Sequence, residues 1–328
     1  MTIKTYAEAI RDTLAEEMRH DENVIVIGED VAELGGIFGC TKGLLNEFGK
    51  ERVRNTPISE AGFVGVGLGA AATGLRPVIE LMYMDFAFVA MDQILNQVAK
   101  IRYMSGGKIG APLVIRGQQG IGRGNAGQHS QSVESIFMHI PGLKVVMPSN
   151  AADAAGLLRT AIRDDDPVMF FEHKVLYSKK CEVPDDIEYT IPFGKAKIVK
   201  EGKDVTVICT HLYVEIVLSV AEKLKSEGID IEIIDPRTLM PLDTETIIKS
   251  IKKTNRAVIV HEAHKICGVG AEIASIIMEE AFTYLDSPVI RVGAKHCTIP
   301  FNLNLENAVV PQEDDIIKAI KNTLYLKV

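Results

Sequence analysis

Short apolar segments alternate with helical segments along almost the whole chain, and this alternation is the strongest limit on its fold. A buried strand, a helix and a second buried strand typically pair in parallel, with helices covering both faces of the sheet. We expect strands at residues 24–27, 78–82, 112–116, 143–147, 168–171, 205–209, 231–234, 257–260 and 289–292. The predicted fold class is α/β, with two domains that each contain a mainly parallel sheet flanked by helices.

The connector at residues 179–193 is polar and contains prolines, which favours a domain boundary there. With 328 residues, the chain is long enough for two cores. We therefore predict one domain at 1–178, a linker at 179–193 and a second domain at 194–328. Within the first domain, one long helix is expected over residues 86–103.

Composition argues against several classes of protein. The net charge of -8 and a pI near 5.6 argue against nucleic-acid binding, which requires a basic face. No uncharged apolar run approaches the roughly 20 residues that cross a bilayer, so no membrane segment is expected. The five cysteines are scattered, without a CxxC pair, and indicate reduced thiols. The N-terminal stretch is an acid-containing amphipathic helix pattern, so we predict a cytoplasmic protein.

Glu60 is the single charge in a long stretch of small, uncharged residues. Ser59 before it is a typical N-cap, so a helix is expected to begin here. Gly62, Gly65 and Gly69 would share one helix face. Because each glycine in a helix costs roughly 0.5–1 kcal/mol relative to alanine, they indicate close approach to a ligand or another helix. Glu60 either stabilises the helix N-terminus or contacts the ligand or helix that approaches there.

His129 follows five glycines in eleven positions, which predicts an imidazole on a surface-facing loop that is mobile until something orders it. A pKa near neutrality would suit proton transfer, although a lone surface histidine commonly has no role. Phe86 follows the strand at 78–82, where parallel sheets place ligands, although an aromatic residue there more commonly begins the core face of a helix.

Three successive acids, residues 164–166, follow a predicted helix. Negative charge is unfavourable at a helix C-terminus, so either a cation binds there or the turn is solvated.

The segment around Glu60, the Gln-His-Ser at 128–130 and the run Asp-Pro-Arg-Thr-Leu-Met-Pro-Leu-Asp at 235–243 resemble one family. They are similar to the beta subunit of the thiamine-diphosphate-dependent dehydrogenases that act on 2-oxo acids or acetoin. The resemblance covers nearly the whole chain. It implies a thiamine-diphosphate pyrimidine-binding domain followed by a transketolase C-terminal-like domain.

The resemblance also implies roles for individual residues. Glu60 would bond a ring nitrogen of the cofactor's aminopyrimidine, Phe86 would stack on that ring, and Ile58 and Met82 would line its pocket. His129 would face the reacting carbon. Backbone carbonyls would bind a structural potassium ion, and the corresponding positions are Leu113, Ala161, Ile162, Asp164 and Asp166.

The sequence has no Gly-Asp-Gly segment, which in this cofactor class usually holds magnesium on the diphosphate. The resemblance therefore implies that an alpha subunit supplies the magnesium ligands, in an alpha2-beta2 heterotetramer. It also implies a lipoyl-bearing acyltransferase as a further partner, docked on the second domain.

The runs at 84–86, 92–97 and 171–178 look most like acetoin dehydrogenase. The sequence prediction is therefore an enzyme subunit that cleaves acetoin and transfers the acetyl unit reductively to lipoamide. Pyruvate or a branched-chain 2-oxo acid is the alternative substrate. A free-standing transketolase-like enzyme and a structural scaffold subunit without catalysis are further alternatives.

Overall fold

The computed structural model describes residues 1–327, which divide into two compact units. The first comprises Met1–Gln119 and Ile136–Phe193. The second comprises Gly120–Ser135 and the chain from Gly194 on. The segment Gly120–Ser135, which lies inside the predicted first domain, thus packs with the second unit. That segment contains His129.

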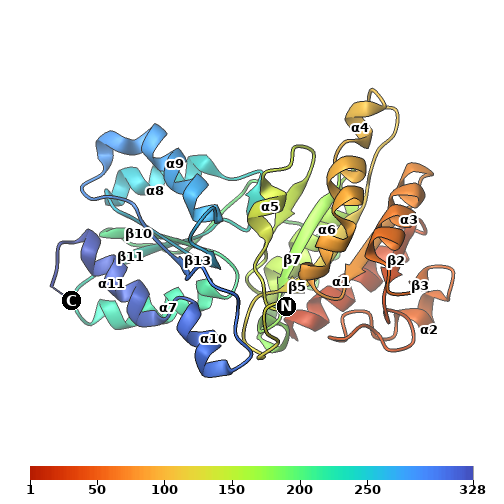
Figure 1. The fold of residues 1–328 in the computed structure, drawn as a ribbon, viewed down its shortest axis with the longest axis horizontal. Coiled ribbons are helices and arrows are strands. Elements are labelled where there is room, and N and C mark those ends of the chain that lie inside the picture. Colours follow the sequence, from red (N-terminus) through yellow and green to blue (C-terminus); the bar gives the residue numbers. More distant parts are fainter. Residues whose placement is uncertain (328) are drawn as a thin grey trace. The chain divides into compact units, whose positions relative to one another are not determined.

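Parallel strands build the sheet of the first unit, in the order β6-β7-β5-β4-β2-β3 (Figure 1). Their bounds are β2 (Val24–Gly28), β3 (Val53–Asn55), β4 (Arg76–Leu81), β5 (Val114–Gln119), β6 (Lys144–Val146) and β7 (Val168–His173). β2, β5 and β7 are buried along their whole length, as expected for strands covered on both faces. The sequence predicted all of them except β3, whose Val-Arg-Asn has no apolar run.

Helices α1 (Tyr6–His20) and α6 (Ala151–Arg163) pack against each other. A capping box between Thr5 and Glu8 begins α1. Glu17 of α1 is buried and accepts two hydrogen bonds of 2.9 Å from Arg163 of α6. The hydrogen bond to Glu17 raises the pKa of Arg163, so this pair stays ionised and fixes the two helices together.

The segment at residues 86–103 is mostly helical, as predicted, but it is not one regular helix. The chain forms a 3-10 helix, η1 (Met84–Ala90), a π-helix, η2 (Gln93–Val98), and α4 (Ile101–Met104). Met84, Ala87 and Ala90 are buried at a spacing of three residues, which is the period of a 3-10 helix. Tertiary packing of that small-residue face therefore overrides the helical pattern.

The glycine that packs closely in α3 (Glu60–Ala72) is not one of the three that the sequence predicted. The predicted face of Gly62, Gly65 and Gly69 is exposed. The close approach is made by Gly67 instead, where an added Cβ would lie 2.4 Å from Cδ1 of Ile79 on β4. Only glycine lets α3 pack this closely on the sheet.

Smaller elements complete the first unit. β1 (Thr2–Thr5) pairs antiparallel with β8 (Lys180–Val183), which ties the N-terminal strand to the end of the unit. The others are α2 (Leu44–Phe48), α5 (Glu134–Met138) and η3 (Leu176–Ser178). Within residues 1–327, no helix has both the length and the hydropathy of a membrane-spanning segment.

The second unit has a five-stranded sheet in the order β14-β13-β10-β11-β9, in which only the edge strand β9 is antiparallel. Its strands are β9 (Lys197–Lys200), β10 (Val205–Cys209), β11 (Ile231–Asp235), β13 (Ala257–His264) and β14 (Ile290–Ala294). In Figure 1, α8 (Thr244–Thr254) and α9 (Val269–Ala281) cover one face, and α7 (Tyr213–Lys225) and α11 (Glu313–Thr323) cover the other. Each face has its own apolar core. Shorter elements are β12 (Thr238–Met240), η4 (Phe282–Tyr284) and α10 (Leu303–Val309).

A buried imidazole, that of His261, lies within β13. The ring of His261 is enclosed by Gly268, Gly270 and Gly293, where an added Cβ would come within 2.6 to 2.8 Å of it. Its Nδ1 is 3.0 Å from the carbonyl oxygen of Ala263, so Nδ1 carries the proton and donates it. Burial lowers the pKa of His261 to about 4, so the ring is neutral at pH 7.

Substituting Gly67 and Gly69 separately tests the packing of α3. Gly67→Ala forces a methyl group against Ile79 and should destabilise the chain by about 1–3 kcal/mol. Gly69→Ala is the matched control, because an added Cβ there meets nothing within 4 Å. It should stabilise the chain by roughly 0.5–1 kcal/mol. Urea unfolding of the two variants measures both changes, and equal midpoints would contradict the packing.

His261→Gln tests the buried imidazole. An unfolded histidine gains a proton near pH 6.5, whereas the folded one does so only near pH 4. The wild-type chain should therefore lose up to about 3 kcal/mol of stability between pH 7 and pH 4 through this group. The variant should show a shallower decline in unfolding free energy over that interval. A decline of equal slope in both proteins would contradict the assignment.

Candidate active site

The carboxyl edge of the first unit's sheet carries unsatisfied polar atoms. β2, β3 and β5 each end there beside a polar side chain: Glu29, Thr56 and Gln118 respectively. Within the described residues, Glu29 Oε1, Thr56 Oγ1 and Gln118 Oε1 are buried without a hydrogen-bond partner. Buried polar atoms are normally paired, and ligands of parallel sheets bind at this edge. These atoms therefore mark a place where a bound group or water completes the hydrogen bonding.

Glu60 begins α3 close to this edge. The backbone N–H of Thr56 donates to the carbonyl oxygen of Gly28 at 3.0 Å, which holds the segment leading to α3 against β2. Ser59 is the N-cap residue but makes no side-chain capping bond, unlike the prediction. The Glu60 side chain is 5% exposed, so this acid is buried although it lies at a helix N-terminus. The structure thus favours an acid with an inward role over one that caps a solvated helix end.

Glu29 is a second acid beside Glu60, and the sequence prediction did not include it among the site residues. Burial raises the pKa of Glu29, and the negative charges of Glu60 and Asp30 raise it further. Two carboxyl groups that share a low-dielectric region favour a state in which one of them holds a proton. The available signal was an acid directly after an all-apolar strand.

Arg116 braces the strands below this edge. Its guanidinium donates two hydrogen bonds to Glu172 on β7, of 2.6 and 2.7 Å, and another to Glu80 on β4. Tyr177 donates to Glu172 at 2.6 Å. Arg116 and Glu172 are fully buried. The strand ends that carry the candidate residues are therefore held by a charged network as well as by backbone pairing.

Two of the residues predicted to line a cofactor ring, Met82 and Phe86, lie near the end of β4. The Phe86 ring is edge-on to Tyr83 at 5.8 Å, and both side chains are half-buried. The amide of Gln118 donates to the carbonyl oxygen of Met82 at 3.1 Å. Ile58, by contrast, is 84% exposed. Met82 and Phe86 thus lie in one β4–η1 segment, while Ile58 offers an open apolar surface just before Glu60.

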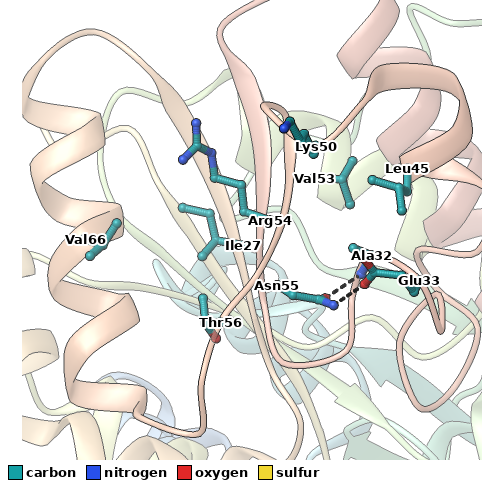
Figure 2. Close-up of a pocket in the computed structure, with 10 residues that line it drawn as sticks. All are labelled: Ile27, Ala32, Glu33, Leu45, Lys50, Val53, Arg54, Asn55, Thr56 and Val66. Atoms are coloured by element: carbon teal, nitrogen blue, oxygen red, sulfur yellow. Dashed lines mark hydrogen bonds between the residues drawn. The ribbon is translucent and has the colours of Figure 1, made fainter.

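A pocket of ≈ 420 Å³ opens next to β3, on the side of Thr56 away from α3's first turn (Figure 2). As Figure 2 shows, the side-chain oxygen of Asn55 accepts a hydrogen bond from the backbone N–H of Ala32, at 2.8 Å, and its amide nitrogen donates one to the Glu33 carboxylate. The pocket is lined by Ile27, Ala32, Glu33, Leu45, Lys50, Val53, Arg54, Asn55, Thr56 and Val66. It contains none of the predicted site residues, so it borders the candidate site without including it.

His129 belongs to the second unit, together with the glycine-rich loop. Its side chain is half-buried, and its backbone N–H lies 3.4 Å from the carbonyl oxygen of Ala126. The loop is closed by a hydrogen bond of 3.1 Å from Gly120 to Gln131. The structure thus gives the glycine-rich loop a hydrogen-bonded closure, and its mobility stays a prediction.

Side-chain cations occupy the acidic turn after α6. Arg76 donates to the carbonyl oxygens of Ile162 and Asp164 at 3.2 and 3.0 Å. Lys144 lies 2.6 Å from Asp164, and Arg102 pairs with Asp166. These cations relieve the negative charge at the helix end.

The remaining predicted potassium positions are also hydrogen-bonded or buried. The carbonyl oxygen of Leu113 accepts from Val168 at 3.0 Å, and Ala161 is buried in the last turn of α6. Among residues 1–327, no three histidine, cysteine or acidic side chains cluster as metal ligands would. A potassium site at this turn, which would use backbone oxygens, stays a prediction.

Two family models match the chain. Residues 3–180 match the pyrimidine-binding domain of transketolase, and residues 194–316 match the transketolase C-terminal domain. The chain is similar to a pyruvate dehydrogenase E1 component subunit beta from Rickettsia felis, at 50% identity over 99% of both chains. It is also similar to an acetoin:2,6-dichlorophenolindophenol oxidoreductase subunit beta from Bacillus subtilis, at 47% identity over 95% of this chain and 94% of that one.

A solved structure described as a split-gene transketolase, an inactive beta4 tetramer, superposes with a TM-score of 0.80 at 23% identity over 99% of both chains. This likeness shows the fold, and it agrees with the predicted pair of parallel-rich domains.

Glu60→Gln tests the pairing of the two acids. Removing the negative charge makes it easier to ionise Glu29, so the pKa of Glu29 should fall towards its ordinary value. Carboxyl-carbon NMR titration of Glu29 measures the shift. Glu51→Gln, at an exposed acid of the same unit, is the control and should leave the Glu29 titration unchanged. An unchanged midpoint in Glu60→Gln would show that the two acids are not coupled.

Proposed function

This chain belongs to the family of beta subunits of thiamine-diphosphate-dependent dehydrogenase E1 components, and we propose that with an alpha subunit it oxidatively decarboxylates pyruvate and passes the acetyl group to lipoamide. It is a subunit of a thiamine-dependent oxidoreductase of pyruvate or acetoin type. The observation that carries the proposal is a buried acid, Glu60, beside a sheet edge with unsatisfied polar atoms.

Pyruvate is favoured over acetoin as the substrate. Relatives named as pyruvate dehydrogenase subunits reach 50% identity, and the relative named for acetoin reaches 47%. Three short runs of the sequence favoured acetoin, but the comparisons support pyruvate, the alternative substrate, better. Acetoin remains the second candidate because the relative from Bacillus subtilis also covers nearly the whole chain.

The residues at the sheet edge fit the aminopyrimidine of the cofactor. Glu60 would hold a proton at a ring nitrogen, where burial strengthens the hydrogen bond. Phe86 would offer an aromatic face, and Met82 and Ile58 apolar walls. When bound, thiamine diphosphate supplies an electron sink for the pair left by carbon–carbon cleavage.

Other residues would assist proton movement. Glu29, whose pKa is raised by burial, would stay protonated more readily than an ordinary acid beside Glu60. His129 would donate to or accept from a substrate oxygen, since an imidazole can do either near neutral pH.

The partners and metal ions follow from the same family. An alpha subunit would carry the magnesium ligands in an alpha2-beta2 heterotetramer, and a lipoyl-bearing acyltransferase would dock on the second unit. A potassium ion at the turn after α6 would be held by backbone carbonyl oxygens, and the corresponding positions are Leu113, Ala161, Ile162, Asp164 and Asp166. A cytoplasmic location also stays a prediction.

Activity of the reconstituted alpha-beta enzyme with lipoamide tests the proposal. Glu60→Gln should lower kcat by about 10²–10⁴-fold without unfolding the chain, because it removes an acid–base group. Glu51→Gln is the control and should retain wild-type turnover. Normal turnover in Glu60→Gln would support the scaffold alternative instead.

Comparing pyruvate, acetoin and a branched-chain 2-oxo acid in the same assay tests the substrate. We expect the highest kcat/KM for pyruvate. A higher value for acetoin would return the assignment to the second candidate, and a higher value for the branched substrate would contradict both.

A further inference from the structure

The His129 loop, residues 120–132, is attached to the second unit at both of its ends. Gly120 donates its N–H to the carbonyl oxygen of Gln131 at 3.1 Å, which closes the loop. Beside this closure, Ile121 and Ser132 both bond to a single residue on another element. His129 lies between these two attachment points in the sequence.

That residue is Glu262, on strand β13. Its Oε1 accepts a hydrogen bond of 2.9 Å from the backbone N–H of Ile121 and one of 3.1 Å from the Ser132 hydroxyl. The Glu262 side chain is 8% exposed. Hydrogen bonds to a carboxylate are stronger than those between neutral groups, and burial removes most competition from water. One carboxylate oxygen of Glu262, on strand β13, thus holds both ends of the loop.

Apolar packing holds the rest of the loop. Ile121 is part of a buried cluster with Ala294, Ile299, Val309 and Val310. An added Cβ at Gly127 would lie 2.3 Å from a methyl group of Thr298, and one at Gly124, whose φ is +62°, would lie 3.0 Å from the Phe301 carbonyl oxygen. The loop therefore lies directly against the segment that leads into α10, and its conformation depends on the second unit's own core.

We propose that Glu262 is a positioning residue of the reaction, which sets the place of the His129 imidazole by anchoring the loop that carries it. This inference rests on the proposed role of His129. Glu262 acts through the loop backbone, so its loss should reduce turnover through His129 and not through folding or cofactor binding. A displacement of about 1 Å in a catalytic group can cost on the order of 10²-fold in rate.

The experiment uses the reconstituted alpha-beta enzyme and a double-mutant cycle. Glu262→Ala should lower kcat by about tenfold or more while the KM for pyruvate changes by less than about twofold, since substrate binding is untouched. Glu262→Gln keeps an acceptor oxygen and should recover most of the loss. The double variant Glu262→Ala/His129→Ala should be no slower than His129→Ala alone, because the two residues act as one unit. Losses that multiply would overturn the proposal.

Glu232 provides a matched control in the same sheet. It is a buried glutamate on β11 that also accepts from a serine hydroxyl, Ser250, and from a backbone N–H, that of Gly202 at 3.3 Å. Glu232→Ala, matched to Glu262→Ala, and Ser250→Ala should change stability but leave kcat as in the wild type. Ser132→Ala, which removes one donor to Glu262, should lower kcat. Equal effects at the two glutamates would mean that Glu262 is only a structural brace.

Hydrogen exchange separates this inference from the proposed function. In Glu262→Ala, the amides of residues 121–132 should exchange at least about tenfold faster, while those of β10 and β11 keep their rates. Unchanged exchange in the loop would overturn the anchoring role even if the enzyme is active. If faster exchange is found but no tested substrate is turned over, the anchor stands and the proposed function fails. Should Glu262→Ala not fold, Ser132→Ala, which removes one of the two hydrogen bonds to Glu262, provides the same comparison.

Discussion

The buried charge network around Arg116 is the constraint on which the first unit depends. In the register of the sheet, Arg116 lies opposite Glu80 on β4, and Glu172 on β7 lies opposite Gln118, two residues along β5. Removing one partner of a buried ion pair typically costs about 3–5 kcal/mol, because a charge is left without compensation. A one-residue slip of β4 or β7 would break the network. The network therefore fixes where each strand ends and which side chain follows it.

The candidate site is a consequence of these strand ends. Because β2, β4 and β5 stop in register, Glu29, Met82 and Gln118 reach one edge of the sheet. The end of β2 also lies very close to β4, because an added Cβ at Gly28 would lie 2.6 Å from the Glu80 carbonyl oxygen. Glycine at this position allows the loop to pass close to β4. The acid that follows, Glu29, is then buried beside Glu60, and burial together with the charge of Glu60 raises the pKa of Glu29.

Much of the fold could be predicted from the sequence, because its strands are short apolar runs with clear boundaries. The failures have physical causes that no local pattern reveals. The segment from Met84 packs a small-residue face with a spacing of three, so tertiary contacts override the helical pattern. The buried glycine of α3 is Gly67 because Ile79 comes from another element. Arg76 reaches the turn after α6 from a strand far away in the sequence.

In the candidate site, too, the features that depend on neighbouring residues could be predicted, and those that depend on residues far away in the sequence could not. Glu60 stood out because it is a lone charge, whereas the importance of Glu29 depends on its closeness to Glu60, which lies 31 residues further along the chain. The composition of the His129 loop predicted mobility, since glycine lowers the cost of many conformations. Its actual order comes from Glu262 and from the segment around Thr298, neither of which lies near it in the sequence.

Both units thus use a buried carboxylate to fix a chain segment on which a candidate catalytic residue depends. Apolar packing alone could supply the stability, since replacing a buried ion pair by well-packed apolar side chains is often neutral or stabilising. It is less able to supply position, because dispersion contacts are non-directional, whereas a carboxylate hydrogen bond fixes both distance and angle. Catalytic groups must be held to within roughly half an ångström. The charged groups inside these cores are therefore better explained by the geometry that the chemistry requires than by the stability of the fold.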